Sequence, residues 1–109
     1  MASSSNASSP AITVRDNPKA HRFEAELDGL IAVADYRIAQ DTVTFTHVGV
    51  PSQIEGRGVG SRLVEAALTA ARERGWRVVP RCPFVAAYMR RHQEVHDLLA
   101  PEARTALKL

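Results

Sequence analysis

Hydrophobic and polar residues alternate along the first half of the chain, which is the pattern of strands with one buried face. In RFEAEL, the apolar Phe23, Ala25 and Leu27 are separated by charged residues. Four runs are of this strand-forming kind: 12–17, 21–27, 30–38 and 42–50. Asp28-Gly29, between the second and third runs, is a strong signal for a tight hairpin turn. The first half therefore predicts an antiparallel meander.

The period of the pattern changes in the second half. Over 58–74, apolar residues recur at helical spacing, and Gly75 is suited to end that helix. The run 76–82 predicts a fifth strand, and Pro83 fits the first turn of a second helix. From 94 on we expect one or two short helical turns. The order is β-β-β-β-α-β-α, which indicates an α+β fold with helices packed on a mostly antiparallel sheet.

The chain divides into a short tail and one domain. Residues 1–10, MASSSNASSP, are rich in serine and hold no large apolar group beyond the first methionine. Such a segment buries too little surface to offset the entropy of ordering, so we expect a disordered tail. The remaining residues, 11–109, have the length of a single domain.

Composition and charge indicate which kinds of binding partner the protein is suited to. The formal net charge is +2, and the 14 Lys and Arg are interleaved with 12 acids, which argues against a nucleic-acid partner. No apolar run reaches membrane-spanning length, and the N-terminus lacks a secretory pattern. Cys82 is the only cysteine, so no intrachain disulfide forms. We therefore expect a cytoplasmic protein without a membrane partner.

The most distinctive motif is EGRGVG at 55–60, which places three glycines at alternate positions just before the predicted helix. It is not a Walker loop, because no Gly-Lys-Ser/Thr follows. Nor is it the dinucleotide fingerprint, whose third glycine would fall on Ser61. Two interpretations stay open from the residues alone. One is a plain glycine-rich turn, and the other is an anion site built from converging backbone N–H groups and a helix N-terminus.

The motif also resembles the acyl-CoA loop of the GNAT superfamily of N-acetyltransferases, with pattern Arg/Gln-x-x-Gly-x-Gly/Ala. The resemblance extends over about 15–95, and it is strongest to a minimal subfamily of short GNAT-like proteins of the YjdJ type. The segments that carry it are RFEAEL at 22–27, HVGVP at 47–51, EGRGVG at 55–60, CPF at 82–84 and AAYMRRH at 86–92. It implies a GNAT-like domain that binds acetyl-CoA and transfers the acetyl group to an amine acceptor.

The resemblance also assigns roles to positions in this chain. Backbone groups of the fourth strand would hold the thioester carbonyl and pantetheine, and the glycine loop would hold the pyrophosphate. The expected acetyl-CoA-binding residues are Val48, Gly49, Val50, Gly56, Arg57, Gly58, Val59, Gly60, Ser61 and Phe84. The catalytic candidates are His47, Cys82 and Tyr88.

Each catalytic candidate has a simpler interpretation beside the chemical one. Histidine as a residue type suits general-base chemistry at neutral pH, so His47 is a candidate base; its simpler interpretations are a histidine hydrogen-bonded within the sheet or one on the surface. Cys82 precedes a helix N-terminus, which favours a reactive thiol, but a free cysteine also packs well as a small apolar side chain. The resemblance implies that Tyr88 protonates the leaving thiolate; its simpler interpretation is an aromatic core residue. His92 and His96 have metal-capable spacing, but no third ligand is in view, so we expect solvated histidines and no metal site.

Two positions depart from the family pattern. Gly49 stands where the subfamily has a glutamate that would serve as a general base, and Glu55 stands where the wider superfamily has Arg or Gln. The missing glutamate supports a second hypothesis, a module that binds CoA or acyl-CoA without catalysis and acts as a sensor or partner. The short C-terminal part, which offers no further predicted strands to shape an acceptor pocket, supports it too.

Overall fold

The computed structural model describes residues 11–109, so the tail predicted over 1–10 lies outside the described residues. Within this range, five strands form one sheet in the order β1-β2-β3-β4-β5. Their bounds are Thr13–Asn17 for β1, Arg22–Leu27 for β2, Leu30–Ala39 for β3, Thr42–Gly49 for β4 and Arg77–Pro80 for β5. Strands β1 to β4 pair antiparallel, and β5 pairs parallel to β4. The predicted meander is confirmed, with strand ends within two residues of those expected.

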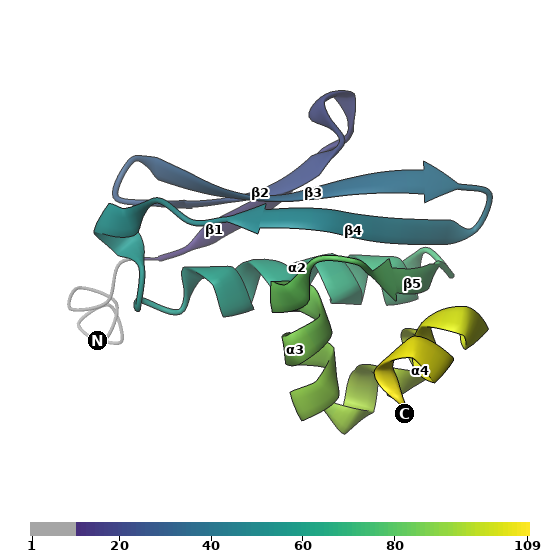
Figure 1. The fold of residues 1–109 in the computed structure, drawn as a ribbon. Coiled ribbons are helices and arrows are strands. Elements are labelled where there is room, and N and C mark those ends of the chain that lie inside the picture. The colour runs from purple at the N-terminus through teal and green to yellow at the C-terminus, as the bar shows by residue number, and fades with distance from the viewer. Residues whose placement is uncertain (1–10) are drawn as a thin grey trace, which may run out of the picture.

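The helices lie together under one face of the sheet (Figure 1). The α-helices are α2 at Val59–Glu73, α3 at Pro83–Arg91 and α4 at Pro101–Leu107. Three short 3-10 helices, η1 at Pro18–Ala20, η2 at Ser52–Ile54 and η3 at Gln93–Leu98, complete the described chain. The element order matches the predicted α+β fold, and Gly75 ends α2 with a φ of 71° as expected. None of the helices within 11–109 is long and apolar enough to cross a membrane.

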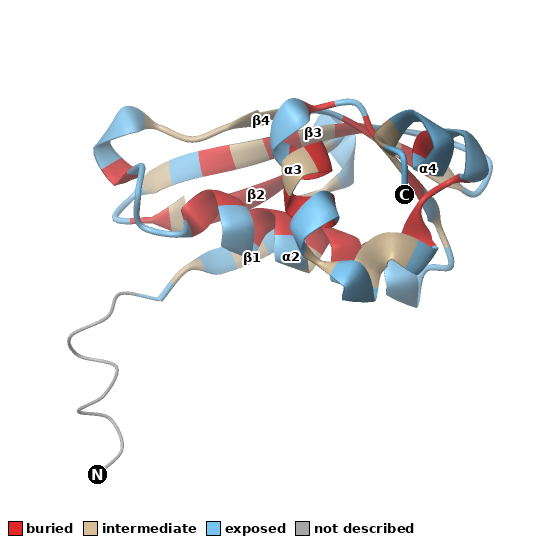
Figure 2. Ribbon diagram, turned by 60° about the horizontal axis from the view of Figure 1, so that its bottom comes forward, coloured by how far each residue is buried: buried red, intermediate tan, exposed pale blue. Residues whose placement is uncertain are grey.

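The core lies between the sheet and α2 (Figure 2). Three aromatic rings from neighbouring strands meet there: Phe23 lies 5.4 Å from Tyr36 and 6.4 Å from Phe45 between ring centroids. From the helix side, Leu63 and Leu68 are fully buried against them. The alternating strand pattern and the helical apolar stripe therefore face each other, and the hydrophobic effect of burying both fixes how the layers stack.

A β-bulge in β4 changes which residues of this strand face the helices. Phe45 opposes Tyr36, but His47 opposes Asp35, so Thr46 is one extra residue in β4. Before the bulge the odd-numbered residues, such as Phe45, are buried under the helices. After it the even-numbered Val48 takes the helix side, because one added residue shifts the two-residue alternation. The continuous strand expected over 42–50 did not include this interruption.

Strands β4 and β5 separate just before the bulge. Their parallel pairing ends at Phe45 and Pro80. The N–H groups of Arg81 and Cys82 then both donate to the Phe45 carbonyl oxygen at 3.0 Å, and the chain turns into α3. The last part of β4, from 46 to 49, therefore has no strand beside it within the described residues on the β5 side. This opening faces the N-terminus of α2.

The C-terminal segment returns to the free side of β5. Leu99 forms a single parallel bridge with Val78. The Ala100 N–H donates to the Val78 carbonyl oxygen at 2.9 Å, directly before α4 begins. The short helical turns expected from 94 on correspond to η3 and α4, but this bridge was not predicted. It adds one residue of pairing to the outer edge of the sheet.

Candidate functional site

The glycine loop has a backbone that only glycine adopts readily. Gly56 and Gly58 both have a φ of 80°, in the left-handed region that side chains with a Cβ disfavour. Neither has another atom within 4 Å of the place where a Cβ would stand, so conformation and not crowding selects glycine there. Gly58 is also the residue from which α2 starts. The loop thus turns twice within three residues and delivers the chain into the helix.

The N-terminus of α2 is open to a ligand. The first N–H groups of an α-helix have no acceptor within the helix, and here the ladder begins with Arg62 N donating to Gly58 O at 3.0 Å. Within 11–109 no side chain caps this end, and its first turn holds no acidic residue. The N–H groups of Val59, Gly60 and Ser61 therefore carry the partial positive charge of the helix end without a competing side chain.

A cleft of about 360 Å³ lies between the free end of β4 and this loop. It is lined by eight of the ten residues expected to bind acetyl-CoA: Val48, Val50, Gly56, Gly58, Val59, Gly60, Ser61 and Phe84. Ile54 and Glu55 complete the lining. Its wall is mixed, with valines from β4 on one side and backbone of the helix start on the other. Such a surface suits a chain-like ligand with an anionic group at one end.

Phe84, from the first turn of α3, closes one side of the cleft. Its ring lies against Gly60, where a Cβ would approach Phe84 Cζ to 2.8 Å. Gly60 has an ordinary helical backbone, so this close contact is the reason for glycine at the position. Phe84 is 40% exposed, one of four large apolar residues in 11–109 that are this accessible. A ring that faces an open cleft offers apolar surface to a ligand.

The other two expected residues, Arg57 and Gly49, do not line the cleft. The Arg57 guanidinium pairs with Asp28 in the β2–β3 turn at 3.1 Å, which directs it away from the loop it belongs to. Gly49 points to the opposite face of the sheet, where a Cβ would stand 3.0 Å from His47 Nε2. Main-chain atoms of Gly49 still belong to the free stretch of β4.

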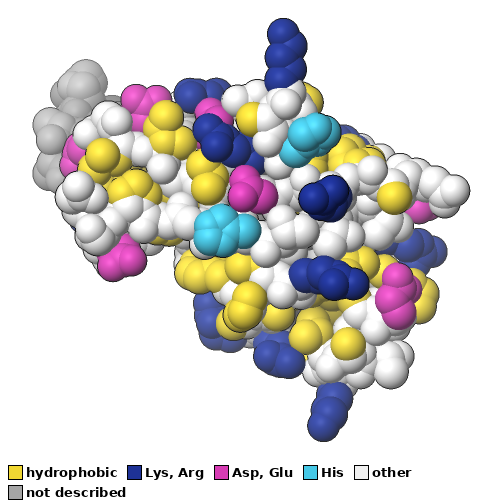
Figure 3. Space-filling view, turned by 45° about the horizontal axis from the view of Figure 1, so that its top comes forward, with side chains coloured by type: hydrophobic (Ala, Val, Ile, Leu, Met, Phe, Trp, Pro, Cys, Tyr) yellow, Lys and Arg dark blue, Asp and Glu magenta, His cyan; other side chains and the backbone are white. Residues whose placement is uncertain are grey.

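His47 lies on the sheet face that the helices leave uncovered. The bulge sets this direction, because it places His47 and Gly49 on the face opposite to Val48. Opposite His47 on β3 is Asp35, and opposite Asp35 on β2 is Arg22. Histidine, acidic and basic side chains are interleaved over this face (Figure 3). His47 is thus exposed and separated from the cleft by the sheet itself.

A buried carboxylate anchors the same face. Glu24 is 3% exposed, although it points away from the helices. It accepts hydrogen bonds from Arg22 at 2.8 Å, Asn17 at 3.1 Å and Arg15 at 3.0 Å. These bonds, that of Arg22 first, hold the pKa of the Glu24 carboxyl below its usual value. Glu24 therefore stays ionised and joins β1 to β2 on the outer face.

Cys82 is buried at the junction between β5 and α3. Its side chain is 4% exposed and belongs to the hydrophobic core. Its backbone N–H donates to Phe45 O, and its carbonyl oxygen accepts from Ala86 N at 3.0 Å as α3 begins. The position beside a helix N-terminus agrees with the expectation. The thiol, however, does not line the cleft.

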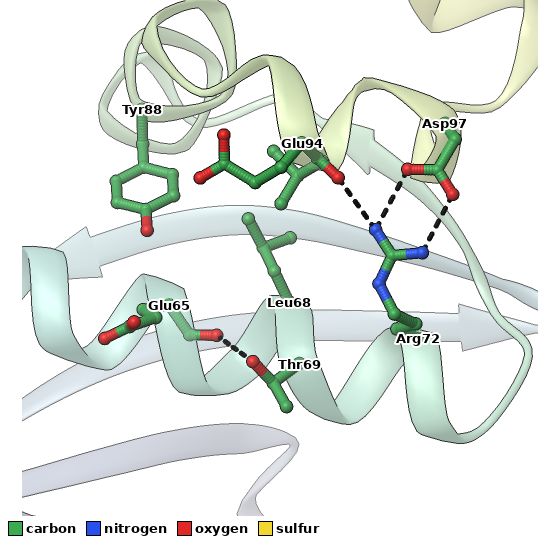
Figure 4. A pocket seen from close by; sticks show the side chains of 8 residues that line it. Glu65, Leu68, Thr69, Arg72, Tyr88, Glu94 and Asp97 are labelled. Carbon is green, nitrogen blue, oxygen red and sulfur yellow. Dashed lines mark hydrogen bonds and ion pairs between the residues drawn. The ribbon is translucent and has the colours of Figure 1, made fainter.

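Tyr88 points into a different pocket from the one Phe84 lines. Its side chain is 7% exposed, and its hydroxyl is directed toward α2 (Figure 4). Burial, and then the negative charges of Glu65 and Glu94, raise the pKa of this hydroxyl above its ordinary value. The phenol ring stacks on His92 with 3.9 Å between ring centroids. Tyr88 and Phe84 are one helical turn apart on α3, so the two pockets are neighbours.

The second pocket was not expected from the sequence. It has a volume of about 550 Å³ and lies between α2, α3 and η3. Four of its lining residues follow the helical spacing i, i+3, i+4 and i+7 on α2: Glu65, Leu68, Thr69 and Arg72. This stripe of mixed polar and apolar residues, beside the apolar stripe of α2, was the one feature of the sequence that could have indicated the pocket. The residues that η3 contributes could not be predicted, because a 3-10 helix leaves no clear periodicity in the sequence.

The expectation that His92 and His96 are solvated surface residues is wrong. His92 Nδ1 lies 2.7 Å from the Tyr88 carbonyl oxygen, and His96 Nε2 lies 2.7 Å from that of Met89. The reason is that α3 ends at Arg91, so the two histidines fold back onto its last carbonyls. No cluster of three or more potential metal ligands occurs among residues 11–109.

Comparison with known proteins agrees with the fold. The family model described as GCN5-related N-acetyl-transferase matches residues 22–98, which include β2 to β5 and the whole cleft. The NMR solution structure of a GCN5-like protein from Staphylococcus aureus is similar, with a TM-score of 0.63 and 23% sequence identity. The match covers 81% of this chain and 87% of that one. No curated protein matches the chain.

Proposed function

The chain belongs to the GCN5-related N-acetyltransferase family, and we propose that residues 11–109 form one domain that binds acetyl-CoA and transfers the acetyl group to an amine. The observation that carries this proposal is the cleft between the free end of β4 and the glycine loop. It combines an open helix N-terminus, two left-handed glycines and an apolar wall. These are the features that a pyrophosphate joined to a long pantetheine chain requires.

The proposed binding mode uses mainly backbone. The N–H groups at the start of α2 would hold the pyrophosphate, with no lysine needed. Val48 and Val50 would contact the pantetheine, and the free main chain of β4 would bond its amides and polarise the thioester carbonyl. Phe84 would cover the ligand from the side of α3. Arg57 contributes little here, because it is already paired with Asp28.

For the chemical step, His47 is the candidate general base. It lies on the outer face, next to the bulge and close to the place where β4 and β5 separate. Because the sheet lies between His47 and the cleft, an amine activated by His47 would have to reach the thioester through the opening where β4 and β5 separate. The amine proton would pass to the imidazole, the amine nitrogen would form the new amide bond, and the C–S bond would break. The thiolate would then take up a proton, for which Tyr88 is the candidate donor.

The alternative is a module that binds acyl-CoA without catalysis. Three observations favour it: His47 is across the sheet from the cleft, Tyr88 opens into another pocket, and the Cys82 thiol is buried. The buried thiol also argues against a covalent acetyl-cysteine route. A cytoplasmic location is part of both forms of the proposal, since the one cysteine is an unpaired thiol.

Two measurements test the proposal in order. Acetyl-CoA at a hundredfold its dissociation constant should raise the free energy of unfolding by about 2.7 kcal/mol, seen as a higher melting temperature. If acetyl-CoA does not raise the melting temperature, both the enzyme and the binding module are excluded. Release of free thiol during incubation with a panel of primary amines then separates the enzyme from the module. Mass spectrometry of the same samples should find Cys82 without an acetyl group.

A further inference from the structure

The imidazole of His47 occupies space that a side chain at position 49 would need. A Cβ on residue 49 would stand 3.0 Å from His47 Nε2 and 3.8 Å from its Cδ2. Non-bonded heavy atoms attract each other best at about 3.5–4.0 Å, so the ring would have to move. Gly49 is a strand residue without a positive φ, and its backbone does not itself require glycine. What glycine provides at this position is room for the imidazole.

The ring lies along β4, in the direction of the strand's end. Residues 47 and 49 share a face, because side chains two positions apart in a strand point to the same side. Asp35 is opposite His47 on β3, yet no ion pair joins the two among residues 11–109. Val33, opposite Gly49, borders the same space, with Cγ2 at 3.7 Å from the place of the Cβ. Nε2 is therefore directed toward Gly49 and not toward the acid.

The main chain beneath the imidazole belongs to the free edge of β4. The pairing with β5 ends at Phe45 and Pro80, so residues 46–49 have no strand on that side within the described chain. An extended ligand that bonds to a strand edge lies in the plane of the sheet and is accessible from both faces. Val48 lines the cleft on the helix face, whereas the His47 ring lies on the other face. The binding edge and the imidazole nitrogen therefore meet at Gly49.

We propose that Gly49 is a positioning residue for acetyl transfer, because its missing side chain leaves the place over the strand edge from which the His47 imidazole acts as the base. This inference rests on the proposed acetyl transfer. The amine proton passes to Nε2 of the neutral imidazole, and the amine nitrogen bonds to the carbonyl carbon. The C–S bond breaks, and its electron pair leaves with the CoA sulfur. A side chain at position 49 turns the ring away and covers the edge from the outer face.

Gly49→Ala tests the contact, because it adds only the Cβ. Alanine suits a strand better than glycine does, so the variant should fold with at least the stability of the unchanged protein. In the NMR spectrum of the unchanged protein, we expect a nuclear Overhauser contact between the His47 ring protons and the Gly49 α-protons. The ring resonances should shift in Gly49→Ala and stay in place in Gly60→Ala, a glycine replacement on the cleft side. Absence of this contact in the unchanged protein would overturn the proposal. This readout needs no acetyl-CoA.

Kinetics test whether Gly49 acts through the imidazole. Gly49→Ala should lower kcat for thiol release by about tenfold and leave the KM for acetyl-CoA unchanged. In a His47→Ala background, measured at higher protein concentration, the same replacement should cause no further loss, because no ring is left to displace. An equal loss in both backgrounds, or an unchanged kcat, would overturn the positioning role while acetyl transfer itself stands. If the unchanged protein binds acetyl-CoA but releases no thiol with any amine, the proposed function fails, and the positioning role fails with it.

Discussion

The Phe84 ring lies so close to Gly60 that a Cβ on residue 60 would stand 2.8 Å from Cζ of the ring. Gly60→Ala must therefore push the ring into the cleft, since the ring's outer side is open. We expect acetyl-CoA affinity to fall by about three- to tenfold. Stability should change little, because alanine favours the helix more than glycine does. Calorimetric titration measures the acetyl-CoA dissociation constant, and thermal unfolding measures the stability.

The double variant Gly60→Ala with Phe84→Leu is the control for this contact. Leucine lacks the ring atoms that meet the new methyl group, so the double variant should recover part of the affinity that Gly60→Ala loses. Equal affinity of the single variant and the unchanged protein would show that the ring has no part in binding.

Gly58→Val should abolish acetyl-CoA binding. Gly58 has a φ of 80°, which a β-branched residue adopts only at a cost of about 1–3 kcal/mol. The loop would change its backbone, and the N–H groups at the start of α2 would lose their alignment. Gly75→Val is the matched control, because Gly75 has a φ of 71° just after α2, at the end of this helix opposite the cleft. It should destabilise the protein to a similar degree and leave the acetyl-CoA dissociation constant of the folded protein unchanged.

Glu55→Gln should leave acetyl-CoA affinity unchanged or raise it by up to about threefold. Glu55 lines the cleft and is exposed, so its negative charge opposes an anionic ligand only weakly through solvent. The measurement is the dissociation constant at two salt concentrations, with any gain smaller at high salt. A marked loss of affinity would mean that Glu55 holds the loop or the ligand and that the cleft is not an anion site.

His47→Gln separates binding from chemistry. His47 faces the uncovered side of the sheet, so the acetyl-CoA dissociation constant should not change. If the imidazole is the general base, the rate of thiol release should fall by about 10²- to 10⁴-fold. An unchanged rate would assign the base to another group, and the absence of thiol release in the unchanged protein would favour the binding module.

Glu24→Gln tests the network on the same face, and its effect depends on pH in a known direction. The folded-state pKa of Glu24 is below the ordinary 4.5, so its contribution to stability is present above that value and is lost as the pH falls toward the lowered pKa. At pH 7 the variant should lose about 1–3 kcal/mol of unfolding free energy. Denaturant unfolding at pH 7 and pH 3 should show a smaller difference at pH 3. An equal loss of unfolding free energy at both pH values would mean that Glu24→Gln acts through packing and not through the ionised carboxylate.

Most of the fold follows from local patterns in the sequence. Alternation in RFEAEL and helical spacing over 58–74 depend only on which residues are apolar, and both predict their elements within two residues. The positions of Gly56 and Gly58 also follow, because their conformation is local. The lining of the cleft was expected from the resemblance to the GNAT superfamily, and it comes mostly from one strand end and the loop that follows it.

The directions of His47 and Tyr88 could not be predicted in the same way. His47 depends on the bulge at Thr46, a residue that alternation alone would place in a regular strand. The pocket around Tyr88 depends on η3, which brings Glu94 next to α2 through contacts between distant parts of the chain. Both are tertiary effects, in which a shift of one residue or one turn decides which way a side chain points.

The single bridge between Leu99 and Val78 has a consequence for how copies of this chain behave in concentrated solution. An outer strand with free N–H and carbonyl groups is a template on which another molecule adds a strand, which is a first step toward aggregation. Leu99 and Ala100 occupy that position on β5, and α4 follows directly beside it. The C-terminal segment thus covers the β5 edge of the sheet beside Val78 and leaves less of that edge open to a second molecule.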